Sequence, residues 1–373
     1  MSEKSIDNLK IAIVCDWLTG IGGAERVVLE LHKLFPKAPI YTSQYDVDKI
    51  DWFKDADIRT TWLQKFPSRL KKFLPVFRAR AFKKLDLSKY DLVISASGAE
   101  AKAVKTGPKT IHINYCHSPT HYYWIRYEEY MKNPGFGAFN WLARIGLKLL
   151  IGPMKRWDYR AAQEPDYMIA NSSFTQANIK QYYNRDSIVI NPPVDIEKFK
   201  SISPTNRKGF VAIGRQVPYK RIDLAVSACS DLNVGLAVIG NGPEHEKLVK
   251  LAGPTVSFIN NSDDLSVANY FKGAEALIFP GLEDFGITAV EALAAGTPVI
   301  AYGGGGAADS IVDKQNGIIF NEQSKASLEE AMNSFKKTKF DEQKISESAE
   351  KFSAEKFDNN ILKFVEQVLA KAG

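Results

Sequence analysis

Residues 10–34 read KIAIVCDWLTGIGGAERVVLELHKL, and the order of residue types in this stretch decides the fold class. The apolar run over residues 10–17 has the length of a buried strand, and Gly22-Gly23 belongs to a tight turn after it. Apolar residues then recur at helical spacing, which predicts a helix over residues 24–34. A strand, a glycine-rich turn and a helix in this order open a doubly wound α/β domain.

The same rhythm continues along the chain and then restarts. Four further buried-strand candidates come first, at residues 91–95, 110–115, 167–170 and 187–190. A polar, proline-containing break follows at residues 191–208. Four more candidates come after it, at residues 209–214, 234–239, 276–279 and 298–302. The restart predicts two consecutive α/β domains, residues 1–195 and residues 205–351, with a helical tail over 352–373.

Length and composition describe a globular chain with room for two cores. The chain has 373 residues, 45% apolar and 25% charged, and domains usually run to about 100–200 residues. The three cysteines, Cys15, Cys116 and Cys229, are odd in number and lack metal-ligand spacing, so we expect reduced thiols that fill core space in a cytoplasmic protein. Residues 1–10 are polar and no run reaches the length of a membrane span, so we expect neither a signal peptide nor an anchor.

Positive charge is concentrated in the first half of the chain. Residues 1–200 hold 31 Lys and Arg against 21 Asp and Glu, whereas the remainder holds 18 against 22. A basic first half indicates an acidic partner, which could be nucleic acid, phosphate or anionic lipid.

Two loops after predicted strands carry groups that suit a phosphate. Gly22-Gly23 precedes a helix, where free N–H groups and the helix dipole favour an anion. Glu25 stands where the third glycine of the G-x-G-x-x-G dinucleotide fingerprint would be, which argues against a dehydrogenase. The alternative reading of Gly22-Gly23 is a simple tight turn. Arg215 and Lys220 follow the strand over 209–214 and could clamp a diphosphate, or could be solvated surface cations.

Residues 280–292, PGLEDFGITAVEA, form the most informative segment. Glu283 follows an apolar strand and could accept hydrogen bonds from sugar hydroxyls. Gly286 permits close backbone approach at a predicted helix start, and Glu291 lies about one turn into that helix, where it could hold ribose hydroxyls. The alternative is a capping acid followed by a surface acid.

Glu283 and Glu291, eight apart with Phe285-Gly286 between them, resemble the Glu-x7-Glu motif of the family 4 glycosyltransferases. Several other segments match the family in the correct order: Gly22-Gly23-Ala24-Glu25, Gly214-Arg215 with Lys220, Gly240-Asn241-Gly242-Pro243 and Ala294-Ala295-Gly296-Thr297-Pro298-Val299. Residues 115–119 and 217–225 resemble more narrowly the mannosyltransferase-like enzymes of O-antigen and exopolysaccharide assembly.

The resemblance implies an α/β fold of the GT-B type, in which two Rossmann-like, doubly wound domains face each other across a cleft. It implies donor binding by the C-terminal domain, acceptor binding by the N-terminal domain, and a final helix over 352–373 that packs back on the N-terminal domain. The catalytic residues that it implies are His117, Arg215, Lys220 and Glu283. The substrate-binding residues that it implies are Gly22, Gly23, Gly242, Asp284, Phe285, Gly286, Ile287 and Glu291.

The resemblance also implies the chemistry. The family retains anomeric configuration through a front-face, ion-pair-like state, and GDP-mannose is the donor that the subgroup suggests. The resemblance implies a metal-independent reaction, so we expect no cofactor and no essential metal. Two positions depart from the family pattern, since Gly281 stands where serine is common and Asp309 where glutamate is common.

Two basic stretches contain interleaved aromatic residues. Residues 65–84 hold eight Lys or Arg and no acid, with Phe66, Phe73, Phe77 and Phe82 among them, and residues 136–157 have a similar composition. Such stretches can lie in an anionic membrane interface, which would suit a glycan or lipid-linked acceptor and peripheral attachment to the inner face of the membrane. The alternative is a solvated basic face with its aromatic residues in the core.

Three other functions remain open at this point. A nucleotide-sugar epimerase shares the architecture, and a non-catalytic sugar-nucleotide-binding subunit would share the binding residues. A nucleic-acid-binding protein would explain the basic half but would leave the glycine loops and paired acids without a role, so we expect no nucleic-acid partner.

Overall fold

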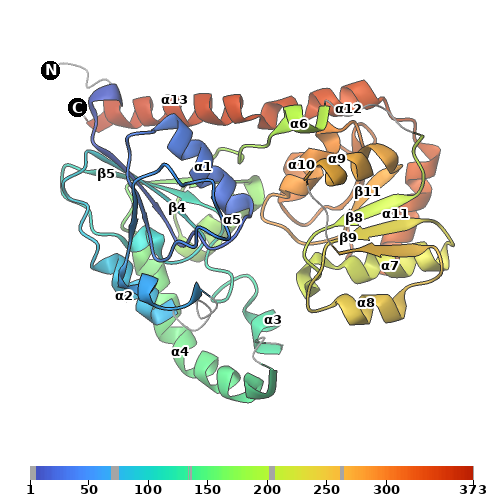
Figure 1. The fold of residues 1–373 in the computed structure, drawn as a ribbon, viewed down its shortest axis with the longest axis horizontal. Coiled ribbons are helices and arrows are strands. Elements are labelled where there is room, and N and C mark those ends of the chain that lie inside the picture. The colour runs from blue at the N-terminus through green and yellow to red at the C-terminus, as the bar shows by residue number, and fades with distance from the viewer. Residues whose placement is uncertain are drawn as a thin grey trace. The chain divides into compact units, whose positions relative to one another are not determined.

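The computed structural model describes residues 6–68, 75–132, 134, 137–200, 206–260 and 264–372. These residues form two compact units, the first made of Met1–Pro192 with Phe357–Gly373 and the second of Pro193–Lys356. Each unit is an α/β domain built on a parallel sheet (Figure 1). The three cysteines are free and buried, which confirms that they are thiols filling core space.

The first unit contains one parallel sheet with the order β3-β2-β1-β4-β5-β6-β7 among the described residues. Its strands are β1 Ile11–Cys15, β2 Ile40–Thr42, β3 Ile58–Thr60, β4 Leu92–Ser97, β5 Ile111–Cys116, β6 Tyr167–Ala170 and β7 Ile188–Val189. Its helices are α1 Gly23–Leu34, α2 Pro75–Lys83, α3 Tyr127–Lys132, α4 Asn140–Ala161 and α5 Ser173–Tyr183, joined by most of α13 Ala354–Ala372. Single-turn 3-10 helices are Ile6–Asn8, Trp62–Lys65, Ala101–Ala103 and Gly137–Phe139.

Alternate residues of β1 explain why this sheet is covered on both faces. Ile11, Ile13 and Cys15 pack with α1 and with Phe357 and neighbouring residues of α13. Ala12 and Val14 point to the opposite layer, where they pack with Phe82 of α2. A strand buried on both faces has no polar alternation, which is why residues 10–17 are a continuous apolar run.

The second unit has the sheet order β10-β9-β8-β11-β12-β13 within the described part of the chain. Its strands are β8 Phe210–Ile213, β9 Leu236–Ile239, β10 Val256–Ile259, β11 Ala276–Phe279, β12 Val299–Tyr302 and β13 Gly317–Phe320. Its helices are α6 Ile196–Lys200, α7 Ile222–Asp231, α8 His245–Leu251, α9 Asp264–Gly273, α10 Ile287–Ala294, α11 Lys325–Lys337 and α12 Glu342–Ser348, with the 3-10 turns Pro218–Lys220, Gly306–Asp309 and Glu350–Phe352.

The expectation of a buried strand over residues 187–190 is wrong. Ile188 and Val189 form a two-residue edge strand, and both side chains are exposed. Since β7 is the last strand of its sheet, it pairs on one side only, and its apolar side chains are not enclosed between layers.

Candidate functional site

Each sheet has one place where the chain reverses its direction of winding. In the first sheet β1 and β4 are neighbours, and in the second sheet β8 and β11 are neighbours. The loops that leave such a strand pair turn to opposite faces, and ligands of doubly wound sheets bind in the crevice that opens there. The sequence-predicted site residues can therefore be located relative to these two switch points.

Lys220 and Glu283 meet at the switch point of the second unit. Lys220 ends the 3-10 turn after β8, Glu283 lies in the loop after β11, and their Nζ and Oε1 atoms are 2.5 Å apart. Each side chain is less than one-fifth exposed, so this pair is only partly solvated. The Lys220 ammonium also lies 5.8 Å from the centre of the Phe279 ring, at the end of β11. A cation and a carboxylate are thus fixed together at the carboxyl edge of the sheet.

The close packing of the loop after β11 on the loop after β8 explains the glycine at position 281. A Cβ atom on Gly281 would lie 3.1 Å from the Lys220 Cα atom and 3.2 Å from the Tyr219 carbonyl oxygen. The loop after β11 therefore packs on the backbone of the loop after β8, and a larger residue would push the two loops apart.

The loops after β11 and β12 are also packed backbone to backbone. The Gly306 N–H donates to the Glu283 carbonyl at 2.8 Å, and a Cβ atom on Gly306 would lie 1.9 Å from the Asp284 carbonyl oxygen. Only a glycine allows this approach. Asp309, the other departure from the family pattern, ends the same 3-10 turn as Gly306, and its carbonyl accepts a hydrogen bond from Lys351.

Residues 284–291 bring a helix start to the same loop. Gly286 has φ +95° and caps α10, a backbone conformation that disfavours any side chain. Phe285 is buried, and Ile287 is the first residue of α10. The first N–H groups of a helix have no partner within the helix, so this start offers donors to an anion. Glu291, four residues into α10, is 7% exposed.

The sequence analysis did not single out Gln216, which follows Arg215 in the chain and lies against the backbone of Gly242. Gln216 is fully buried, its amide donates to the Gly240 carbonyl at 2.7 Å, and its side-chain oxygen lies 2.8 Å from His245 Nδ1. A Cβ atom on Gly242 would lie 2.4 Å from the Gln216 carbonyl oxygen. Gln216 thus ties the loop after β8 to the loop after β9, while Arg215 is exposed.

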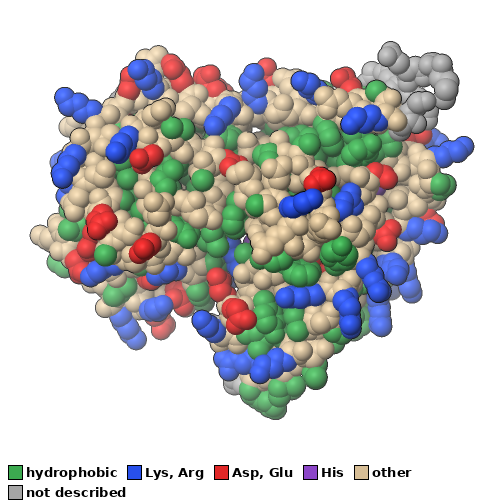
Figure 2. Space-filling model, turned by 180° about the vertical axis from the view of Figure 1, so that it is seen from behind, with side chains coloured by type: hydrophobic (Ala, Val, Ile, Leu, Met, Phe, Trp, Pro, Cys, Tyr) green, Lys and Arg blue, Asp and Glu red, His purple; other side chains and the backbone are tan. Residues whose placement is uncertain are grey.

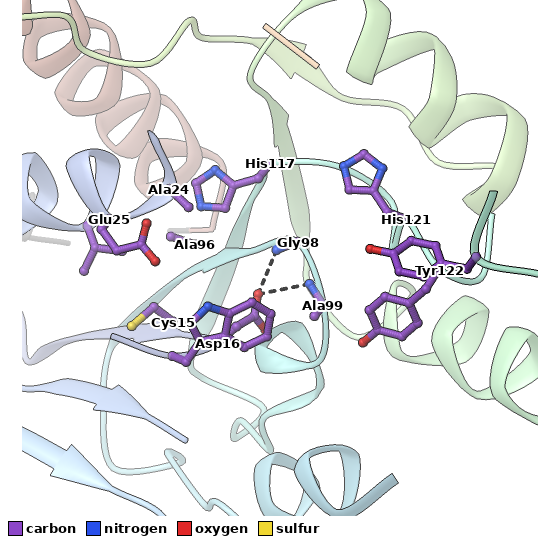
Figure 3. A pocket seen from close by; sticks show the side chains of 13 residues that line it. Cys15, Asp16, Ala24, Glu25, Ala96, Gly98, Ala99, His117, His121 and Tyr122 are labelled. Atoms are coloured by element: carbon purple, nitrogen blue, oxygen red, sulfur yellow. Dashed lines mark hydrogen bonds between the residues drawn. The ribbon is translucent and has the colours of Figure 1, made fainter. Parts of the chain in front are cut away.

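In the first unit a pocket of about 250 Å³ lies at the carboxyl edge of the sheet. Figure 3 shows Ala24 and Glu25 of α1 on one side of this pocket and His121 and Tyr122 on the other. His117, which directly follows β5, also lines it. Gly22 and Gly23 stand at the start of α1, one turn or less from Ala24 and Glu25. The predicted glycine pair and histidine are therefore brought to the same pocket region.

Asp16 is the residue of this pocket that the sequence reasoning missed. Its carboxylate accepts hydrogen bonds from the N–H groups of Gly98, Ala99 and Ala101, at 2.7–3.0 Å, and from the Ser97 hydroxyl. Two of these bonds are drawn in Figure 3. Asp16 follows β1 and its donors follow β4, so this carboxylate closes the switch point of the first sheet.

Among the described residues of this unit, two ion pairs are buried. Arg78 of α2 donates to Glu100 at 2.8 Å, and Tyr122 of the pocket wall donates to the same carboxylate at 2.6 Å. The Arg78 guanidinium also lies 5.0 Å from the centre of the Trp17 ring. Burial raises the pKa of Glu100, and Arg78 opposes that shift. This pair therefore fixes two aromatic walls of the pocket, Trp17 and Tyr122.

The second pair is Lys102 with Asp158 of α4, 2.7 Å apart and both at most 2% exposed. The Asp158 carboxylate also accepts from Thr120, Trp124 and Tyr183 at 2.7–2.9 Å. Among the described residues, no group of three or more His, Cys, Asp or Glu side chains is arranged to hold a metal ion.

The four predicted catalytic residues divide between the units. Lys220 and Glu283 are in direct contact, Arg215 lies in the same loop as Lys220, and His117 belongs to the first unit. Their roles stay predictions.

The aromatic residues of 65–84 and 136–157 have different surroundings. Phe82 is fully buried, whereas Phe66 and Phe77 are exposed, and each packs edge to face on Trp62. Residues 69–74, which include Phe73, and Phe136 lie outside the described residues. None of the helices in the described ranges is both long and apolar enough to cross a membrane.

Comparisons with known proteins agree with this architecture. The family model described as Glycosyltransferase Family 4 matches residues 21–198, and the model described as Glycosyl transferases group 1 matches residues 193–352. D-inositol 3-phosphate glycosyltransferase of Mycolicibacterium smegmatis is 27% identical over 187 residues, which cover 43% of this chain and 43% of that protein. The match therefore spans less than half the length of that curated relative.

Solved structures match over nearly the whole chain. Sucrose-phosphate synthase of Thermosynechococcus elongatus has a TM-score of 0.71 at 18% identity, covering 96% of this chain and all of that chain. HepE of Anabaena in complex with UDP and glucose has a TM-score of 0.66 at 17% identity, covering 96% of this chain and 99% of that chain. The fold is thus GT-B, with two Rossmann-like parallel-sheet units. The chain belongs to the glycosyltransferases that the two family models describe, with Family 4 in its first half and group 1 in its second.

Proposed function

We propose that this protein is a glycosyltransferase that uses a nucleotide sugar as donor and binds it at the switch point of the second unit. The observation that carries the proposal is the 2.5 Å pair between Lys220 and Glu283 beside the start of α10. A nucleotide sugar carries both a diphosphate and a polyhydroxylated ring. An ammonium, free helical N–H groups and a carboxylate are the complementary groups for these two parts.

The same groups suit the transfer step. As the glycosidic bond to the donor phosphate breaks, negative charge accumulates on the leaving diphosphate. Lys220 and Arg215 would stabilise that charge, and Glu283 would hold hydroxyls of the transferred sugar. The ion pair with Glu283 keeps the Lys220 ammonium oriented before the donor arrives, which reduces the reorganisation that the reaction requires. Glu291 would hold the ribose, and His117 would act on the transferred sugar.

We propose GDP-mannose as the donor and a glycan or lipid-linked molecule as the acceptor, on the subgroup resemblance of residues 115–119 and 217–225. The relatives widen the set to be tested, because one is a D-inositol 3-phosphate glycosyltransferase and one was solved with UDP and glucose. The acceptor would be reached at an anionic membrane surface, through the basic aromatic stretches 65–84 and 136–157.

We further propose that transfer retains anomeric configuration and needs no metal. In a front-face reaction the departing phosphate itself can take the proton of the acceptor hydroxyl, so no separate carboxylate base is required. Excess EDTA should then leave the initial rate unchanged, and the product of an α-linked donor should be α-linked by NMR. An inverted product or a rate abolished by EDTA would contradict this part of the proposal.

Donor binding is tested by thermal stabilisation with GDP-mannose, UDP-glucose, UDP-GlcNAc and UDP-galactose. The variants are Glu283→Gln and Lys220→Met, and the matched control is Lys325→Met, which breaks the exposed pair with Asp231 in the same unit. We expect one donor to stabilise the wild type and the control but neither site variant. If no nucleotide sugar stabilises the wild type, the proposal fails. Epimerisation of the bound sugar without acceptor would indicate an epimerase instead.

A further inference from the structure

Helix α4 carries an apolar stripe that no part of the described chain covers. Trp141, Leu142, Ile145 and Leu149 are 48–72% exposed, and Phe139, directly before the helix, is 68% exposed. Isolated exposed apolar residues are common, but a contiguous group of large ones marks an interaction surface.

Helical geometry shows that these side chains point away from the protein. At about 100° per residue, Trp141, Leu142, Ile145 and Leu149 fall within an arc of about 100°. The buried residues of α4, Met154, Asp158 and Ala161, lie on the opposite side of the helix. The N-terminal half of α4 therefore turns its apolar face outward, the reverse of a helix that packs on its own domain.

Basic side chains accompany this stripe. Lys148 and Arg156 are exposed. On the helix, Lys148 lies beside the stripe, and Arg156 lies on its continuation about two turns beyond Leu149. The single acid of α4 is Asp158, which is buried against Lys102. Figure 2 shows hydrophobic side chains gathered at the lower tip of the first unit, where α4 lies in Figure 1, with Lys and Arg side chains next to them.

Other cations of this region are engaged with the protein. Arg144 donates to the carbonyls of Met131 and Lys132 at 2.9 and 2.6 Å, which ties α4 to the end of α3. Lys155 lies 4.9 Å from the centre of the Trp124 ring. These contacts hold α4 in place from one side and leave its apolar stripe, Lys148 and Arg156 directed outward.

We propose that the N-terminal half of α4, with Trp141, Leu142, Ile145 and Leu149, inserts into the interface of an anionic lipid bilayer. An outward apolar stripe with exposed cations and no exposed acid on the same helix matches a layer of apolar chains beneath anionic headgroups. A second copy of this chain fits less well, because it would bring Lys148 and Arg156 against the same cations of its partner. The inference deepens the membrane part of the proposed function by naming the surface, and it does not depend on the donor.

The test uses the full chain with vesicles of phosphatidylcholine alone or mixed in equal parts with phosphatidylglycerol, without nucleotide sugar. The apolar variant is Ile145→Ser with Leu149→Ser, and the charge variant is Lys148→Glu with Arg156→Glu. The matched control is Val249→Ser with Leu251→Ser, which changes two exposed apolar residues on α8 of the second unit. We expect the wild type and the control to cosediment with the anionic vesicles only, and each α4 variant to partition at least about tenfold less.

A second readout locates the contact. Anionic vesicles should shift the tryptophan emission of the wild type to the blue, and Trp141→Phe should lose most of that shift. Wild-type behaviour of both α4 variants, or no wild-type binding to anionic vesicles, would overturn the inference. So would a dimer in solution that the apolar variant converts to a monomer. Donor-induced thermal stabilisation measured on the same variants should stay at the wild-type value, which separates failure here from failure of the donor site.

Discussion

Replacing Lys102 by Met should destabilise the first unit strongly, because it leaves a buried carboxylate without its cation. Lys102 and Asp158 are 2.7 Å apart and at most 2% exposed. Burial lowers the pKa of Lys102, but the Asp158 carboxylate raises it by more. The net pKa is therefore above the ordinary value, and the amine is charged in the folded state. Removing one partner of a buried pair costs about 3–5 kcal/mol.

The remaining contacts of Asp158 place the expected cost near the lower end of that range. Three neutral donors, Thr120, Trp124 and Tyr183, still hydrogen-bond the carboxylate after the substitution. We therefore expect a loss of about 3 kcal/mol in the free energy of unfolding. For a unit of this size that loss corresponds to a fall of roughly 6–12 °C in the Tm of the first unit.

Urea unfolding followed by circular dichroism, together with calorimetry to resolve the two units, measures this loss. Lys102→Met with Asp158→Asn should lose less than Lys102→Met alone, because no ionised group is then left buried. The control Lys105→Met breaks an exposed pair with Asp86 and should change little. A cost for Lys102→Met below about 1 kcal/mol, the range of surface pairs, would refute the reasoning.

Three further predictions concern single residues. Burial raises the pKa of Asp358 to about 6, so the folded state favours the protonated acid, and stability is lost as pH rises through 6. Asp358→Asn should therefore stabilise the protein at pH 7 by about 1 kcal/mol, after allowance for solvent screening, and not at pH 4. Burial lowers the pKa of His112 to about 3, so wild-type stability should fall as pH drops below about 6.5, and His112→Gln should flatten that slope in urea titrations. Gly306→Ala would place a Cβ atom 1.9 Å from the Asp284 carbonyl oxygen; the loop must shift, and donor-induced stabilisation should disappear, whereas Gly20→Ala, with open space around it, should keep it.

The apolar strands inside the two sheets and their glycine turns were predictable from the sequence. The run at 10–17 became β1 Ile11–Cys15, the run at 276–279 became β11, and the helix expected after Gly286 is α10. These elements are buried on both faces, so their apolar residues are continuous and the signal is strong.

Four strands were not predicted: β2, β3, β10 and β13. β2 and β3 are only three residues long, too short for a periodic signal. β3 and β10 each lie at one edge of their sheet and have exposed or half-exposed residues, so they lack a continuous apolar run. Their place depends on pairing with a central strand, which is a long-range property of the fold.

The candidate site was predictable where it follows a strand with an unusual turn and not where it depends on contact across loops. Glu283 and Lys220 are 63 positions apart in sequence, and only the order of the strands brings them together. Asp16 and Gln216 were not predicted, because a single polar residue at the end of a strand has no distinctive sequence pattern. Their importance lies in the buried N–H and C=O groups that they satisfy on the neighbouring loop.

The most direct test of the central claim is the release of nucleotide from a nucleotide sugar by the purified protein, with GDP-mannose first in the panel. We expect slow release of GDP without acceptor, faster release with a lipid-linked glycan, and loss of both in Glu283→Gln and Lys220→Met, whose folds should be intact by circular dichroism. Release that is unchanged in both variants would contradict the assignment of the Lys220–Glu283 pair to the donor site. Failure to release nucleotide from any sugar in the panel, with or without acceptor, would contradict glycosyl transfer by this protein.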